Sequence, residues 1–453
     1  MEQFYWQKVE KVSFAKLKIL TDRGFGYVRE RITFDDETFK RVDEEIAVYS
    51  DVQPAVKPFL AKQSALLASL AISKLEGQNT IGINEARTIF ADRERGARRQ
   101  DTSGAVNRVT AKDDYSRLEY ENIVDTLQFV NSEKFIPPSA RPHLIHRLSP
   151  ELIQDLHHRL TDGLDRFDGY VIGFSKYNAG RFRDTDEVVV GLGRFGDHYR
   201  PIPSKDIPSE LKRLIEFLQH NPTITGVNLF ITGLYAIHPF RNGNKRLCRI
   251  LEHALLRDLG LNKYNIYNPS RYYSNKVNLE RFHAALQQTL ALRNFTPFVN
   301  LSREALFFSQ LSVMEYVVAI RRRDFLKEQV RDPDLRDAYK VLAENKAKTY
   351  SQVLEHMQRV LKKTSKGSTE RSIVTYLKQA TKDRVLLRER KGRTALYSLS
   401  LQLDEERYLK EAIGRNLDHI EYIPADLSKL LYFPGEAPRT STFSPIRTPS
   451  GGF

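Results

Sequence analysis

The feature that most constrains this fold is a pair of apolar helical patterns separated by a short polar turn near the middle of the chain. Residues 224–237 carry apolar side chains every three or four positions, and a second pattern extends from about Asn244 to Leu259. This spacing predicts two helices, the first with one apolar face. We therefore expect a mainly α-helical fold. The residues of that apolar face are Val227, Phe230, Ile231, Leu234 and Ile237.

Other segments favour the same fold class. An amphipathic helix is predicted from about Phe39 to Leu75, and helical periodicity returns at residues 119–130 and 209–221. Residues 95–116 are polar, charged and poor in large apolar groups, which predicts a long loop or an insertion. The N-terminal part should therefore be mostly helical, with one long interruption.

The clearest strand signal in the central region lies between Tyr170 and Pro203. Here Val188, Val189 and Val190 stand among several glycines and end at Gly191. Consecutive β-branched residues between glycines favour a short β-hairpin over a helix. A hairpin is thus expected shortly before the two central helices.

The chain has 453 residues, of which 41% are hydrophobic and 28% are charged. This is enough apolar material for two or three packed cores, and the chain is too polar on average for a membrane protein. No run of about 18 apolar residues occurs, and the first residues lack the apolar core of a secretory signal. The sequence predicts a soluble, multidomain, cytoplasmic protein with no membrane association. Its single cysteine, Cys248, excludes an internal disulfide and a multi-cysteine metal site.

The chain is also strongly basic. It holds 71 Lys and Arg against 57 Asp and Glu, a net charge of +14. Such an excess favours a polyanionic partner such as nucleic acid or a phosphorylated ligand. An even scatter of cations over a large surface is the alternative. Residues 359–393 hold 12 Lys and Arg against 3 Asp and Glu, a net +9, so much of the excess is clustered.

A second domain is predicted after Arg331, where the composition becomes basic. Thr349 and Gln352 have the spacing of a capping box that opens a helix, and another helix is expected over residues 369–380. Two strands joined by a turn at residues 391–392 would follow. This order of helix, turn, helix, strand, turn and strand is that of a winged helix.

If this domain is a winged helix bound to DNA, its basic side chains on the second helix and at the turn would face phosphates. Two alternatives stay open. Many winged helices pack against a partner domain or mediate dimerisation, so a homodimer is one expectation, and basic helices are often only solvated. The tail at residues 433–453 is rich in Pro, Ser, Thr and Gly and is predicted to be disordered.

The turn between the two central helices, residues 238–249, reads HPFRNGNKRLCR. Backbone N–H groups freed at the start of the second helix carry the positive end of the helix dipole, and Gly243 lets an anion approach them closely. One lysine and two arginines lie near the same end, so the turn could hold a polyphosphate. His238 at its rim could take a proton from a hydroxyl that attacks the phosphate. Alternatively, His238 only caps a helix, Gly243 only makes a turn and the cations coat a solvated face.

This string closely resembles the signature of the Fic (Fido) family, H-P-F-x-D/E-G-N-x-R-x-x-R. A β-hairpin flap precedes the signature in that family, and Gly180, Phe182 and Arg183, then the valines ending at Gly191, follow its pattern here. The resemblance extends over roughly residues 40–300. The residues that match the signature are His238, Pro239, Phe240, Gly243, Asn244, Arg246 and Arg249.

The resemblance implies a protein adenylyltransferase, which transfers AMP from ATP to a hydroxyl side chain of a target protein. It implies that His238 is the general base and that the flap receives the target as an added strand. It also implies that the phosphates are bound by the loop and the helix that follows, with Arg246 on the β-phosphate and Arg249 on the γ-phosphate. Relatives of this fold also move UMP, phosphocholine or phosphate, so the nucleotide stays open. With Lys245 as a further cation near the helix start, the expected phosphate-binding residues are Gly243, Asn244, Lys245, Arg246 and Arg249.

Self-inhibiting members of the family carry a helix with the motif S/T-x-x-x-E-G/N. The stretch AISKLEGQNT places Glu76 and Gly77 as in that motif, with Ile72 where Ser or Thr is usual. The resemblance therefore implies that Glu76 pairs with Arg249 in the resting state and inhibits the enzyme.

Asn242 departs from the signature. The family has an acid at this position that coordinates the magnesium ion bridging the phosphates, and an amide offers only a neutral oxygen. We therefore expect weakly bound magnesium and lower activity. The phosphates and water could still hold the metal, in which case Asn242 only moderates the rate. The other alternative is a catalytically weak or inactive protein that acts as a DNA-binding regulator.

These patterns together predict the domain organisation. A helical region with the inhibitory-type helix would occupy residues 1–120, and the Fic core residues 121–300. Linker helices and the winged-helix-like domain would occupy residues 301–400, followed by a C-terminal helix and the disordered tail at residues 401–453.

Overall fold

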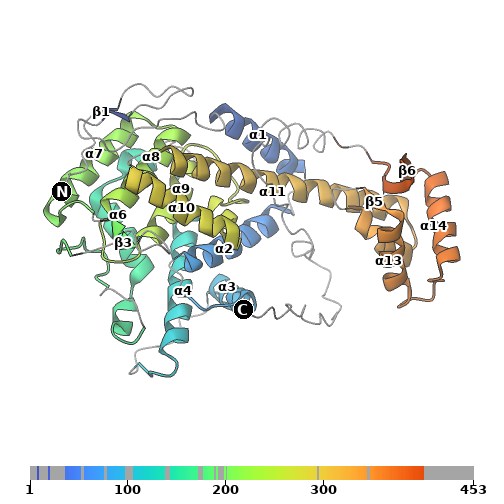
Figure 1. Ribbon diagram of the computed structural model, residues 1–453, viewed down its shortest axis with the longest axis horizontal. Coiled ribbons are helices and arrows are strands. Elements are labelled where there is room, and N and C mark those ends of the chain that lie inside the picture. The colour runs from blue at the N-terminus through green and yellow to red at the C-terminus, as the bar shows by residue number, and fades with distance from the viewer. Residues whose placement is uncertain are drawn as a thin grey trace. The chain divides into compact units, whose positions relative to one another are not determined.

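The structure is a computed structural model of the chain, shown in Figure 1. Its described residues fall into two compact units, one ending at Met314 and one starting at Glu315, so the division lies within helix α11 (Thr296–Gln329). None of the described helices combines the length and the apolar run needed to cross a membrane. The described residues are 8–9, 19–20, 36–52, 56–75, 79–96, 106–137, 143–171, 177–187, 190–191, 198–199, 201–292, 295–343, 347–401 and 403.

The first unit is built from helices, as the apolar periodicity predicted. Its helices are α1 (Asp36–Val52), α2 (Val56–Lys74), α3 (Ile83–Glu94), α4 (Ala111–Asn131), α5 (Leu144–Arg147), α6 (Pro150–Thr161), α7 (Ile207–His220), α8 (Ile224–Ile237), α9 (Asn244–Asp258) and α10 (Lys276–Leu292), with the start of α11. Its short 3₁₀ helices are Leu164–Phe167, Ser204–Asp206 and Pro269–Ser274, and its two-residue strands are β1 (Lys8–Val9), β2 (Ile19–Leu20), β3 (Val190–Gly191) and β4 (His198–Tyr199).

Helices α8 and α9 lie in the core of this unit. Every residue of α8 is buried, and α8 packs against both α7 and α9. Helix α4 packs against α2, α3, α6 and α9, so it lies between the N-terminal helices and the central pair. Local chemistry sets where the central helices begin: the Thr223 hydroxyl accepts from the Gly226 N–H at 2.9 Å at the start of α8. Such caps satisfy backbone donors that a helix leaves unpaired.

Two sequence expectations for the N-terminal part are wrong in detail. The region predicted as one helix from Phe39 to Leu75 is described as two helices, α1 and α2, and Pro58 lies in the first turn of α2, where a proline removes no intrahelical hydrogen bond. The loop predicted to reach residue 116 ends earlier, because α4 already begins at Ala111. Asp113 and Asp114 lie in its first turn, where acidic side chains stabilise the positive end of the helix dipole.

The predicted hairpin is present where it was expected. Strands β3 and β4 pair antiparallel, with Val190 opposite Tyr199 and Gly191 opposite His198. Val188 and Val189 lie outside the described residues. The short described pair thus confirms a hairpin between Tyr170 and Pro203.

The second unit contains the element order that its sequence predicted. The Thr349 side chain accepts from the Gln352 N–H and the Gln352 side chain accepts from the Thr349 N–H, so the capping box of α13 is confirmed. Strand β7 lies between β5 and β6 in an antiparallel sheet, and Gly392 adopts φ 62° at the turn of the β6–β7 hairpin. The core of this unit includes Val353, Met357, Leu361, Ile373 and Leu377. The elements are the end of α11, α12 (Pro333–Tyr339), a 3₁₀ helix (Lys340–Ala343), β5 (Lys348–Thr349), α13 (Tyr350–Leu361), α14 (Glu370–Lys382), β6 (Leu386–Lys391) and β7 (Thr394–Leu399).

Candidate functional site

The candidate site is the loop that joins α8 to α9. Helix α8 ends at Ile237, and the N–H of His238 donates to the Leu234 carbonyl at 3.0 Å. His238 adopts the left-handed conformation, with φ 49°, which turns the chain away from the helix axis. Helix α9 then begins at Asn244. The predicted order of helix, histidine, turn and helix is confirmed.

Glycine is required at position 243 for two reasons. Gly243 adopts φ 77° immediately before α9, a conformation that other residues rarely adopt. A Cβ atom added there would lie 3.1 Å from Thr161 Cγ2 and 3.2 Å from His157 Nε2. Both neighbours belong to α6. The loop therefore lies directly against α6 at the point where α9 begins.

The loop is closed by its own side chains. Asn244 is buried, its Oδ1 accepts from the Phe240 N–H at 3.1 Å, and its Nδ2 donates to the Phe240 carbonyl at 2.8 Å. Phe240 is fully buried and packs against Phe182, with ring centroids 5.3 Å apart. Asn244 therefore holds the loop in shape, in addition to any role toward a ligand.

The base of the flap is tied to the loop by Arg183, the arginine of the flap motif. Its Nε donates to the His238 carbonyl at 2.9 Å, and its backbone N–H donates to the Pro239 carbonyl at 2.9 Å. The side chain is buried and also donates to the Ile202 carbonyl, at the far end of the flap segment. Nearby, Arg241 forms an ion pair with Asp184 at 2.5 Å, and this hydrogen bond holds the pKa of the Asp184 carboxyl below its ordinary value.

His157 is part of this site, and the sequence interpretation missed it. Its Nε2 lies 2.9 Å from the Asn242 carbonyl, and its Nδ1 accepts from the Gly180 N–H at 3.0 Å. Its ring stacks on Phe240 with centroids 3.7 Å apart and planes 3° apart. Burial lowers the pKa of His157 to about 3. The available signal was the helical spacing of α6, whose buried face includes Ile153, Leu156, His157 and Leu160.

The two signature arginines lie in separate buried environments. Arg246 is fully buried, and its guanidinium forms an ion pair with Glu119 of α4 at 2.6 Å. The same guanidinium donates to the Tyr177 hydroxyl at 2.7 Å and lies 3.5 Å from Asn242 Oδ1. Glu119 is fixed in turn by Tyr115, whose hydroxyl donates to it at 2.5 Å. Sequence spacing could not identify this cluster, because its members come from distant segments.

Arg249 is also fully buried. Its guanidinium lies 2.7 Å from Glu252 on the same helix. Its Cζ atom lies within 6.0 Å of the centroids of four aromatic rings. Aromatic faces stabilise a buried cation through their quadrupoles. These rings belong to Tyr235, Tyr273, Phe282 and Phe298.

The site does not fit a metal ion held by the protein alone. Asn242 Oδ1, the oxygen in place of the family's acid, accepts from the Gly243 N–H at 2.7 Å. Within the part of the chain that the structure describes, no group of three His, Cys, Asp or Glu side chains is arranged to hold a metal. Magnesium in proteins usually binds one or two carboxylates together with substrate phosphates. Any magnesium here would depend mainly on the phosphates of a ligand.

Two of the predicted site elements lie outside the described residues. These are Glu76 with Gly77, and the valines Val188 and Val189 of the flap. Asn79, two positions after the inhibitory-type motif, is described, and its Nδ2 donates to Glu119 Oε2 at 2.7 Å. The chain next to the motif is therefore bound to the carboxylate that pairs with Arg246.

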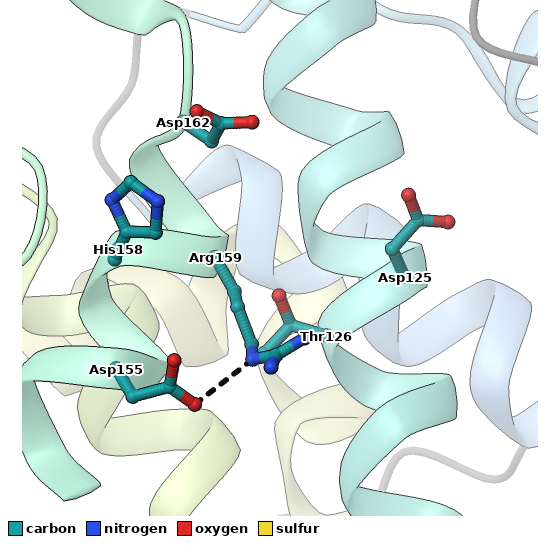
Figure 2. Close-up of a pocket in the computed structure, with 6 residues that line it drawn as sticks. All are labelled: Asp125, Thr126, Asp155, His158, Arg159 and Asp162. Carbon is teal, nitrogen blue, oxygen red and sulfur yellow. Dashed lines mark hydrogen bonds and ion pairs between the residues drawn. The ribbon is translucent and has the colours of Figure 1, made fainter.

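A polar hollow is lined by side chains of α4 and α6 and by Asp162, which directly follows α6 (Figure 2). It has a volume of 320 Å³ between α4 and α6. Its carboxylates have partners: Asp125 binds Arg93 through two hydrogen bonds of 2.8 and 2.6 Å, and Asp155 binds Arg159 at 3.0 Å. We assign no ligand to it. The residues lining it are Asp125, Thr126, Asp155, His158, Arg159 and Asp162.

Part of the chain matches a known protein family. Residues 147–256 match the model of the Fic/DOC family, a range that includes α6, the flap, the loop and most of α9. The chain therefore contains a Fic/DOC family domain at residues 147–256. A probable protein adenylyltransferase of Aquifex aeolicus is 25% identical over 149 residues, which are 32% of this chain and 45% of that protein. The chain thus matches less than half of that relative's length.

Solved Fic structures are also similar at low identity. A Fic family protein from Desulfovibrio desulfuricans superposes with a TM-score of 0.42 and 16% identity, covering 84% of this chain and all of that chain. Fic-1 from C. elegans superposes with a TM-score of 0.41 and 17% identity, covering 63% of this chain and 72% of that chain.

Proposed function

We propose that this protein is a protein adenylyltransferase that transfers AMP from ATP to a hydroxyl side chain of a target protein. The observation that carries the proposal is the loop from His238 to Asn244, which joins a buried helix to the N-terminus of α9 and has the Fic signature residues in one compact turn. A helix N-terminus next to a left-handed glycine is a suitable place for phosphate groups.

In the proposed reaction, His238 accepts the proton of the target hydroxyl. The hydroxyl oxygen then forms a bond to the α-phosphorus of ATP, and the bond from that phosphorus to the β-phosphate oxygen breaks. AMP is thereby joined to the target and pyrophosphate leaves. His238 is only partly buried, and its backbone is held by Arg183 and by the cap on Leu234. Such positioning and charge stabilisation supply most of the catalysis in phosphoryl transfer.

The arginines impose a condition on this proposal. Arg246 and Arg249 are assigned to the β- and γ-phosphates, yet both guanidiniums are fully buried and paired with carboxylates. Direct phosphate contact therefore requires local rearrangement when the nucleotide binds. The same proposal includes a resting state in which Glu76 pairs with Arg249. This pairing would oppose contact of Arg249 with the γ-phosphate.

The strand pair β3–β4 is the proposed docking site for the target. An extended peptide that adds to a short hairpin is recognised mainly through its backbone. Gly180 and Arg183 connect the start of this flap to the catalytic loop through hydrogen bonds to His157 and to the His238 carbonyl. A docked target hydroxyl would thus be held close to His238.

The test is transfer of label from ATP. Purified protein is incubated with ATP labelled at the α-phosphate, and in parallel with ATP labelled at the γ-phosphate, together with a lysate as a source of targets. AMP transfer labels protein only from the α-position. His238→Ala is expected to abolish labelling and to leave ATP binding nearly intact, whereas His220→Ala, at an exposed histidine at the end of α7, is the matched control.

Label from the γ-position would indicate phosphate transfer instead. Equal labelling by the parent protein and by His238→Ala would refute the proposed mechanism. UTP and CDP-choline in the same assay distinguish the other reactions known for this fold.

A second candidate function is DNA binding by the second unit. The observation that favours it is the exposure of the basic cluster: Arg388, Arg390 and Lys391 on β6 are exposed, as are Arg371 and Lys378 on α14. Several cations that displace counterions from DNA produce a steep salt dependence. A gel-shift titration of the full protein on duplex DNA between about 50 and 200 mM salt tests this, and no shift at low salt would contradict it.

A further inference from the structure

We infer that His157 is a positioning residue that holds the anion-binding loop against the base of the flap. Its consequence for catalysis rests on the proposed function, but its structural part does not. The residue comes from α6, 81 positions before His238 along the chain. It contacts the loop at the Asn242 carbonyl and the start of the flap at the Gly180 N–H.

The hydrogen bonds of His157 allow one protonation state. The Gly180 N–H can only donate, so Nδ1 must be the acceptor, and the Asn242 carbonyl can only accept, so Nε2 must carry the proton. The neutral Nε2–H tautomer satisfies both bonds. An imidazolium would direct a second N–H at the Gly180 N–H and would lose that bond.

The surroundings of His157 support the same state. Burial is the main cause that lowers its pKa, and the positive charges of Arg246 and His158 act in the same direction. The bond to the Asn242 carbonyl opposes them. His157 is therefore neutral in the pH range of enzyme assays and does not serve as a second base beside His238.

The ring also determines where the loop lies. It stacks on Phe240, and its Nε2 would lie only 3.2 Å from a Cβ atom at position 243, closer than side chains usually approach. Three points of the loop, namely Phe240, Asn242 and Gly243, thus depend on one imidazole. Through Gly180 the same imidazole sets the start of the flap, so the anion site and the target site are held at a fixed separation.

The neighbouring His158 provides a matched control. It is exposed and lines the hollow of Figure 2, and a Cβ atom added at Gly180 would lie 3.0 Å from its Cβ. The His158→Gln variant removes an imidazole from the same helix, keeps the Cβ atom beside Gly180, and leaves both hydrogen bonds of His157 and its stacking on Phe240 in place.

The experiment compares His157→Phe, His157→Gln and His158→Gln with the parent. Phe keeps an aromatic ring to stack on Phe240 and removes both hydrogen bonds. Gln lets an amide donate to the Asn242 carbonyl and removes the stack and the bond from the Gly180 N–H. The first readout is the ¹⁵N NMR spectrum of histidine-labelled protein. One histidine signal of the parent, missing from the spectra of both His157 variants, should be that of the Nε2–H tautomer and should not change from pH 5 to pH 8.

The second readout is the position of the loop. The ring signals of His238 should shift in His157→Phe and stay in place in His158→Gln, because only the former releases the loop. The third is binding of a non-hydrolysable ATP analogue, which should weaken about tenfold in His157→Phe, about threefold in His157→Gln and not at all in the control, as expected for the loss of one or two buried hydrogen bonds. The graded loss, with Gln intermediate, is what a merely structural role would not produce.

A His157 signal that titrates near pH 6.5 or reads as the Nδ1–H tautomer would overturn the inference. So would a folded His157→Phe variant with unshifted His238 signals. If the parent binds no nucleotide, the proposed function fails, while the first two readouts still decide the role of His157.

Discussion

The buried ion pair between Arg246 and Glu119 makes a quantitative prediction about stability. Among the described residues, every partner of the Glu119 carboxylate is a donor: the Arg246 guanidinium at 2.6 Å, the Tyr115 hydroxyl at 2.5 Å and Asn79 Nδ2 at 2.7 Å. In Glu119→Gln the new amide NH₂ must face one of these donors, and the guanidinium loses its counter-charge. Removing one partner of a fully buried pair costs about 3–5 kcal/mol of unfolding free energy.

The matched control is Asp155→Asn. It breaks the pair of Asp155 with Arg159, in which the side chains are 45% and 43% exposed. Solvent screens such a pair, so this variant should lose no more than about 1 kcal/mol. Both variants remove one carboxylate from a helix of the first unit without a change in volume, so the difference between them reports burial of the charge.

Urea titration of the full protein, followed by hydrogen-exchange mass spectrometry of peptides from α4 and α9, measures the first unit separately from the second.

Removing both charges in Glu119→Leu with Arg246→Met should restore stability to within about 2 kcal/mol of the parent, because a buried pair replaced by apolar groups is close to neutral. Tyr115 and Asn79 keep partners in this variant, the Tyr177 hydroxyl and the Ser116 carbonyl. Equal losses in Glu119→Gln and Asp155→Asn, or a double variant as unstable as the sum of the single variants, would refute this reasoning.

Three further predictions concern two buried histidines, Asn242 and Glu76. Burial lowers the pKa values of His157 and His253 to about 3, so both stay neutral in the folded protein, whereas the unfolded chain binds protons at these side chains below about pH 6.5. Each histidine should therefore lower the unfolding free energy by about 2 kcal/mol between pH 7 and pH 5. Urea titrations at the two pH values should show that His157→Gln removes its share of this loss, and an unchanged dependence of the unfolding free energy on pH would contradict the prediction. Asn242→Asp should lower the magnesium concentration needed for half-maximal labelling, since a carboxylate binds the ion more strongly than an amide. The intact mass of the parent protein must be recorded, because deamidation of Asn242 before Gly243 makes the same change. Identical magnesium curves for the variant and the parent would show that the metal is held elsewhere. Glu76→Gly should raise automodification in the labelling assay, and equal rates would exclude an inhibitory carboxylate.

The sequence alone predicted those parts of the structure that depend on neighbouring residues. The capping box of Thr349 and Gln352 is present, and the loop begins after Ile237 and ends with a left-handed Gly243. Caps, turns and apolar periodicity are set by hydrogen bonds and backbone preferences within a few positions. The signature string could therefore be recognised, and the fold class with it.

The tertiary structure alone decided which side chains meet in the site. His157 lies 85 residues before Asn242, whose carbonyl it binds, and the Arg246–Glu119 pair joins α9 to α4. The sequence placed both signature arginines near the start of α9, either around a polyphosphate or on a solvated face, whereas packing buries each guanidinium against its own carboxylate. The physical reason is that charge and periodicity can be read along one helix, but burial and partner choice depend on which other helices cover it.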